Sequence, residues 1–110
     1  AFDIAVLVLK GRINFSMKQQ PAWLPPPHQY ISNQYLMGKN LTVSGWGALE
    51  YEEWGPYELH SVEVPFVKWW QCKQLFPEGW ITKVMMCAGN VEDGGVDSCQ
   101  GDSGGITKIK

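Results

Sequence analysis

The order of apolar and polar residues predicts several short β-strands. The apolar run Ile4–Leu9, rich in β-branched residues, favours a buried strand that ends at Lys10-Gly11. Residues 62–66 alternate apolar side chains with Glu and Pro, which is typical of a half-buried strand. Shorter strands are expected over residues 41–44 and 84–88. The chain is therefore expected to be mainly β-structure.

Two segments depart from this strand pattern. Between residues 68 and 76 the apolar side chains recur on one helical face, which predicts a short helix ending at Pro77. Residues 21–27 carry Pro25-Pro26-Pro27, and prolines sustain neither helix nor interior strand. This segment is expected to be an extended connector.

Composition is that of a globular core. The 110 residues are 45% hydrophobic and 13% aromatic, and no apolar run is long enough to span a membrane. Nine basic and eleven acidic residues give a net charge of −2 without a basic cluster, so nucleic acid is not an expected partner. The three cysteines and two histidines lack zinc-ligand spacing. We expect no metal and no organic cofactor.

The most specific chemistry is carried by Asp97–Gly105, with the sequence DSCQGDSGG. Its glycines leave the backbone beside Ser103 uncovered, so a reacting carbonyl could approach closely. The backbone N–H groups of Gly101 and Ser103 could stabilise the oxyanion of an acyl transfer. Gly, Ser and Asp also dominate ordinary turns, so a shorter match would more often indicate a loop.

Several motifs together resemble the trypsin-like (chymotrypsin-fold, peptidase family S1) serine endopeptidases, and in finer detail their tryptase-like or prostasin-like branch. The matching segments are Gly101–Gly105, Asp3-Ile4-Ala5, Ser44-Gly45-Trp46-Gly47 and Cys87-Ala88-Gly89. The resemblance implies an all-β fold of two six-stranded antiparallel β-barrels. This chain would be a fragment of it.

The resemblance also implies a division of the chain as one partial peptidase domain. Residues 1–13 would be the last strand region of the first barrel, residues 14–39 the connector between barrels, and residues 40–110 an incomplete second barrel.

By the same resemblance, Ser103 is the nucleophile and Asp3 is the carboxylate that orients a catalytic histidine. The family takes that histidine from the first barrel, upstream of this chain. His28 follows the proline run and His60 precedes the alternating strand, so neither is expected to replace it. We therefore expect the 110-residue polypeptide alone to be inactive.

Specificity is implied by Asp97, which matches the base of the primary specificity pocket. A carboxylate there favours a substrate Arg or Lys, with Ser98 adding a hydroxyl contact and Gln100 at the rim. The alternative is that Asp97 only caps a turn after Gly94-Gly95. Asp102 matches the carboxylate that pairs with a new N-terminal amine when a zymogen is cleaved.

The resemblance pairs Cys72 with Cys87 and pairs Cys99 with a cysteine beyond Lys110. An unpaired cysteine fits the expectation of a fragment. Sequons at Asn14 and Asn40 are compatible with a secreted glycoprotein. Whether a C-terminal segment outside this sequence anchors the protein to a membrane is not decided by these residues.

Two departures from the family pattern stand out. Leu41 and Ile109 occupy positions where many relatives have a bonded cysteine pair, and two apolar side chains could pack there instead. Residues 106–110 do not continue GDSGG with the usual proline and apolar strand.

The functional prediction is a secreted serine endopeptidase that hydrolyses peptide bonds after Arg or Lys through an acyl-enzyme. Its partners would be protein or peptide substrates and protein protease inhibitors. The alternatives are a catalytically inactive homologue acting as a secreted binding or regulatory module, and a truncated product that does not fold.

Overall fold

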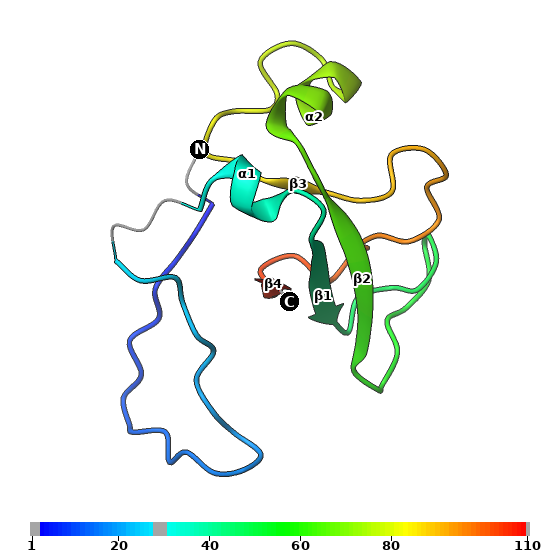
Figure 1. The fold of residues 1–110 in the computed structure, drawn as a ribbon. Helices are drawn as coiled ribbons and strands as arrows, with labels where there is room; N and C mark the ends of the chain where they lie inside the picture. Colours follow the sequence, from blue (N-terminus) through cyan, green and yellow to red (C-terminus); the bar gives the residue numbers. More distant parts are fainter. Residues whose placement is uncertain (1–2, 28–30, 110) are drawn as a thin grey trace.

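The computed structural model describes residues 3–27 and 31–109. Its elements follow in the order α1 (Asn33–Leu36), β1 (Asn40–Gly45), β2 (His60–Val67), α2 (Trp69–Leu75), β3 (Cys87–Ala88) and β4 (Thr107–Ile109). The strands form one sheet in the order β3-β2-β1-β4 (Figure 1). All three pairings are antiparallel.

The centre of the sheet is the long pair of β1 and β2. Leu41 lies opposite Val64, and both side chains are almost fully buried, at 0% and 1% exposure. Alternate residues of β2 point outward, so the strand predictions for residues 41–44 and 62–66 are confirmed. The strand predicted over residues 84–88 is shorter, since β3 holds only Cys87–Ala88.

The predicted helix forms as α2. It ends at Leu75, and Phe76 already has an extended backbone, with φ −122° and ψ 156°. A residue that precedes proline is disfavoured in the helical region, so Pro77 explains this end. The prediction of a short helix ending at the proline is therefore confirmed.

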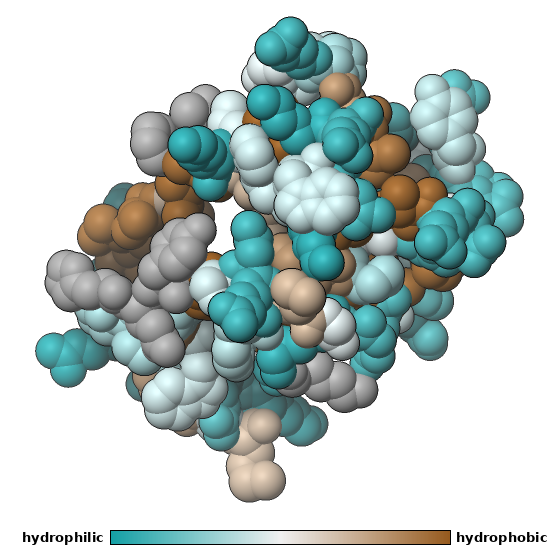
Figure 2. Space-filling model, turned by 45° about the horizontal axis from the view of Figure 1, so that its top comes forward, coloured by the Kyte–Doolittle hydropathy of each residue, from teal (hydrophilic) through white to brown (hydrophobic). Residues whose placement is uncertain are grey.

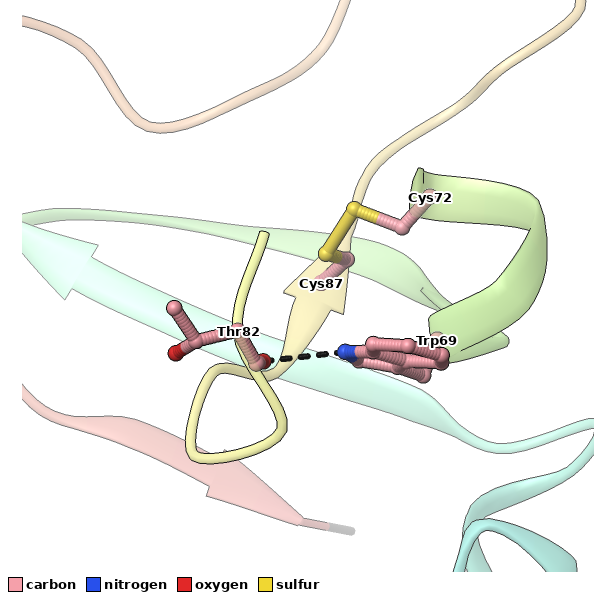
Figure 3. The surroundings of a disulfide bond; sticks show 4 residues. All are labelled: Trp69, Cys72, Thr82 and Cys87. Carbon is pink, nitrogen blue, oxygen red and sulfur yellow. Dashed lines mark hydrogen bonds between the residues drawn. A yellow bond between two sulfur atoms is a disulfide. The ribbon is translucent and has the colours of Figure 1, made fainter. Parts of the chain in front are cut away.

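A disulfide joins α2 to β3, between Cys72 and Cys87 (Figure 3). Beside it, the indole N–H of Trp69 donates a hydrogen bond of 2.9 Å to the backbone carbonyl of Thr82. The Nζ of Lys73 lies 5.4 Å from the centre of the Trp69 ring, within the range of a cation–π contact. The Cys72–Cys87 pairing implied by the resemblance is confirmed, and the indole bond also ties the intervening loop to α2. The pairing of Cys99 with a cysteine outside this sequence stays a prediction.

The opposite edge of the sheet is formed by β4. Ile109 lies in register with Leu41, so the two apolar residues that the resemblance places at a cysteine pair of many relatives are cross-strand partners. Cross-strand neighbours on one face of a sheet pack directly against each other. Two apolar side chains can thus pack at this position without a covalent link.

The prediction of a buried strand at Ile4–Leu9 is wrong for this structure. Residues 3–9 have no regular secondary structure, and Ile4, Val6 and Val8 are 84%, 87% and 93% exposed. A strand needs a hydrogen-bonded neighbour, and none of the described residues pairs with this segment. Figure 1 shows residues 3–27 as a long excursion to one side of the sheet.

Among the described residues, the buried side chains form a small group in and beside the sheet: Leu36, Leu41, Ala48, Val64, Val67 and Cys72. Figure 2 shows brown hydrophobic residues at the surface of the molecule in this view. The radius of gyration is 15.9 Å, whereas a compact domain of this length would have about 13 Å. The described residues therefore cover the hydrophobic side chains of the sheet only in part.

Candidate active site

The segment from Cys99 to Gly105 consists of two consecutive turns. The N–H of Asp102 donates to the carbonyl of Cys99 at 3.1 Å, and the N–H of Gly105 donates to the carbonyl of Asp102 at 2.9 Å. The third residue of each turn is a glycine with positive φ, +97° at Gly101 and +83° at Gly104. A turn with this geometry favours glycine there. The turns present Ser103, which is exposed, at the second position of the second turn.

The two predicted oxyanion donors are free within the described part of the chain. The N–H groups of Gly101 and Ser103 donate to no other described group. Free donors beside an exposed hydroxyl are what an acyl-transfer site needs.

The Asp102 carboxylate is half-buried and accepts two backbone hydrogen bonds. Gly47 N–H donates to Oδ1 at 2.9 Å and Cys99 N–H donates to Oδ2 at 3.0 Å. A third bond between the same segments runs from Ala48 N–H to the carbonyl of Gln100, at 2.8 Å. Asp102 forms no ion pair within the described ranges, so its pairing with an amine stays a prediction. The start of the β1–β2 loop thus holds the turns that carry Ser103.

Asp97 is exposed and lines a cleft of about 200 Å³ that Asp102 and His60 also line. Its Oδ1 accepts a 2.7 Å hydrogen bond from the N–H of Ser98 and lies 3.5 Å from the Ser98 hydroxyl. The local bond is of the kind expected for a turn residue, whereas the position in a cleft suits a specificity pocket. Ser98 and Gln100 are also exposed beside it.

A complete Ser-His-Asp set does not come together among the described residues. Asp3 is exposed in the irregular N-terminal segment and has no hydrogen bond to Ser103. His60 begins β2 opposite Gly45 and is also not bonded to Ser103. His28 lies outside the described residues.

The other predicted positions are accessible or partly so. Asn14 and Asn40 are both exposed, and Cys99 is a free, half-buried cysteine. In residues 3–27 and 31–109, no three His, Cys, Asp or Glu side chains are grouped as metal ligands. Over the same ranges, neither helix has the length and apolarity to cross a bilayer.

Sequence reasoning found the Ser44–Gly47 motif but missed what it does. A Cβ atom built on Gly45 or Gly47 would overlap the carboxyl group of Asp102, and one on Gly101 would lie 3.2 Å from the Cα of Gly47. The two glycine-rich motifs are therefore packed against each other. Their joint presence was the only signal in the sequence.

Known proteins are similar to this chain over almost its whole length. The Trypsin family profile matches residues 1–106. The chain is 37% identical to "Serine proteinase stubble" of Drosophila melanogaster, 38% identical to "Trypsin" of Phaedon cochleariae and 39% identical to "Venom protease" of Bombus pensylvanicus. These alignments cover 99%, 97% and 97% of this chain, but 14%, 40% and 42% of the respective relatives.

The chain belongs to the trypsin-like serine protease family. Its curled antiparallel sheet is part of a chymotrypsin-like β-barrel, which agrees with the fold class expected from the motifs. The chain spans less than half the length of each of these relatives.

Proposed function

We propose that the protein containing this chain is a serine endopeptidase. The observation that carries the proposal is the presentation of Ser103 between two turn glycines and beside two free N–H donors. Its neighbour Asp102 lines the same cleft as Asp97. Such an arrangement suits attack on a peptide carbonyl and stabilisation of the resulting oxyanion.

In the proposed reaction, the Ser103 Oγ attacks the carbonyl carbon as a histidine from the first barrel takes its proton. Asp3 orients that histidine, and the N–H groups of Gly101 and Ser103 hold the oxyanion. The histidine then protonates the leaving amine, and water releases the acyl group. The division into residues 1–13, 14–39 and 40–110 is part of this proposal, as is secretion with glycans at Asn14 and Asn40.

The proposed substrates carry Arg or Lys before the cleaved bond. Asp97 forms no ion pair within the described residues, so its charge is available to a guanidinium or ammonium group. A charge-assisted hydrogen bond to that group would favour basic over apolar side chains. Ser98 and Gln100 would border the same pocket, and basic reactive-site loops of protein inhibitors would bind there too.

The test is hydrolysis of fluorogenic peptides by the complete peptidase domain that includes this chain. Arg and Lys substrates should exceed Phe substrates by at least about 10²-fold in kcat/KM, since one desolvated charge pair discriminates by several kcal/mol. Asp97→Ser should remove most of that preference, whereas Asp93→Ser, an exposed acidic residue in the preceding loop, should not.

Two outcomes would overturn parts of the proposal. An unchanged preference in Asp97→Ser would leave Asp97 as a turn residue. A complete domain that binds a basic inhibitor without hydrolysing any peptide would instead be the inactive binding homologue.

A further inference from the structure

Arg12, the single arginine of the sequence, lies in the excursion to one side of the sheet (Figure 1). Residues 10–15 have no regular secondary structure, and their backbone groups form no hydrogen bond with any residue that the structure describes. All of them are exposed, and chain neighbours aside, no described atom lies within 4 Å of a Cβ built on Gly11. The peptide bond between Arg12 and Ile13 is therefore accessible.

This exposure differs in origin from that of the preceding apolar run. Residues 4–9 are all apolar, so a neighbouring strand would bury them. Most of residues 10–20 instead carry charged, amide or hydroxyl side chains, which are seldom buried. The segment around Arg12 is therefore expected to stay at the surface of the complete domain.

Most other basic residues lie in backbone that is already hydrogen-bonded. A peptide bound as an extended strand gives its main-chain groups to the partner, so a segment without internal hydrogen bonds binds most readily. Lys18 lies in a turn closed by bonds of 2.9 and 3.2 Å between Ser16 and Gln19. The later lysines of the described chain lie in or next to a helix, a strand or a bonded turn: Lys39, Lys68, Lys73, Lys83 and Lys108.

Lys10 shares the open segment with Arg12 but is followed by a different residue. Gly11 comes after Lys10, and glycine loses the most conformational freedom when it is held extended. Ile13 comes after Arg12, and its β-branched side chain favours the extended backbone. Of the two bonds, Arg12–Ile13 is the better fit to a strand-like binding groove.

A glycosylation sequon begins two residues after Arg12. Asn14 is exposed and is followed by Phe15 and Ser16. A glycan on Asn14 is bulky and would fill the space that a peptidase needs on the C-terminal side of the Arg12–Ile13 bond. One short segment thus carries an accessible basic residue and a position for a group that can cover it.

We propose that Arg12–Ile13 is a controlled cleavage site, open to an Arg-directed endopeptidase in the bare chain and closed by a glycan on Asn14. In the cleavage, water adds across the peptide bond, leaving a carboxylate on Arg12 and an amine on Ile13. The proposal rests on the proposed function in one respect, since glycosylation of Asn14 requires secretion.

The position of the cut gives it a consequence for the proposed peptidase. The cut falls between Asp3 and Ser103, which are the proposed orienting carboxylate and nucleophile. The disulfide Cys72–Cys87 lies wholly on the Ser103 side. Within this sequence, no covalent bond would then join the two proposed catalytic residues.

The first experiment tests the site in the complete peptidase domain carrying Ser103→Ala, produced without glycans. Added trypsin is the probe, and mass spectrometry identifies the cuts. Within these 110 residues, the cut after Arg12 should be at least about 10-fold faster than that after Lys18, because the turn must first lose two backbone hydrogen bonds.

Arg12→Gln should abolish this cut, whereas Lys18→Gln, the matched control in the same excursion, should retain it. Faster cutting of this chain at another lysine would overturn the proposal. So would resistance of the Arg12–Ile13 bond while other bonds of the chain are cut.

The second experiment tests the closure with the same Ser103→Ala domain secreted from glycosylating cells. Peptide mass spectrometry measures occupancy of Asn14. The glycosylated domain should lose the Arg12 cut under conditions that digest the bare domain completely. Asn14→Gln should restore the cut, whereas Asn40→Gln, which removes the other exposed sequon, should not. An Asn14 without glycan, or equal cutting of the glycosylated and bare domains, would overturn the closure.

Neither experiment uses the catalytic activity of this chain, because Ser103→Ala removes the proposed nucleophile. A third incubation replaces trypsin with the unsubstituted, unglycosylated domain. If trypsin cuts after Arg12 and this domain does not, the result counts against the proposed Arg and Lys preference and leaves the cleavage site established. Failure of the site and failure of the proposed function are thus distinguished.

Discussion

Gly101 and Gly104 occupy equivalent positions in their turns but differ in what surrounds them. A Cβ on Gly101 would lie 3.2 Å from Gly47, whereas a Cβ on Gly104 would meet nothing within 4 Å. Gly104 therefore isolates the conformational cost of positive φ from the cost of crowding. That cost is about 1–2 kcal/mol for a residue with a side chain.

Replacing Gly104 by Ala should lower the free energy of unfolding of the complete domain by about 1–2 kcal/mol, because Ala resists a positive φ. Urea denaturation measures the change. Gly11→Ala, which lacks a positive φ, should stay within about 1 kcal/mol of the parent. Equal stability of Gly104→Ala and its parent would contradict the turn geometry.

At the scale of elements, β1 is a central strand of the sheet, with a paired neighbour on each side. It pairs with β2 on one side and β4 on the other, and its Leu41 is fully buried between Val64 and Ile109. Removal of a buried side chain from such a position leaves a cavity that neighbouring strands cannot fill without losing register.

Leu41→Ala should destabilise the complete domain by about 2–5 kcal/mol through lost burial and the cavity left behind. Leu49→Ala is the matched control, because Leu49 is 59% exposed and a surface change of this kind costs within about 0.5 kcal/mol. The two are compared by chemical denaturation. A similar loss in both variants would contradict the central role of β1.

Over the whole molecule, the sequence correctly predicted the elements whose hydrogen-bond partners lie within the chain. Residues 62–66 and the helix before Pro77 formed as expected, because their partners lie within the chain. The strand at Ile4–Leu9 did not, since an apolar run shows that burial is favoured but not which residues will supply the neighbouring strand.

In the candidate site, too, local features could be predicted from the sequence and contacts between distant segments could not. The turns around Ser103 could be predicted from the sequence, because the positive φ of Gly101 and Gly104 favours glycine whatever the rest of the fold is. The contact of Gly47 with Asp102 joins residues far apart in sequence, and no periodicity reveals such a contact. The catalytic roles of Ser103, Asp3 and Asp97 remain predictions.

The 110-residue polypeptide alone should not react with a serine-directed phosphonate, because no described histidine is bonded to Ser103 to accept its proton. Mass spectrometry after incubation measures labelling, with the complete domain as the positive control. Stoichiometric labelling of the polypeptide would show that Ser103 is activated by some other base.

The two edges of the sheet are secured by different chemistry, and this has a consequence for how the molecule responds to reductants. Edge strand β3 is joined to α2 by the Cys72–Cys87 bond, whereas edge strand β4 meets β1 through Leu41 and Ile109. Thiols can cleave the first link but have no target in the second. A reducing environment should therefore loosen the β3 edge while the β4 edge keeps its packing.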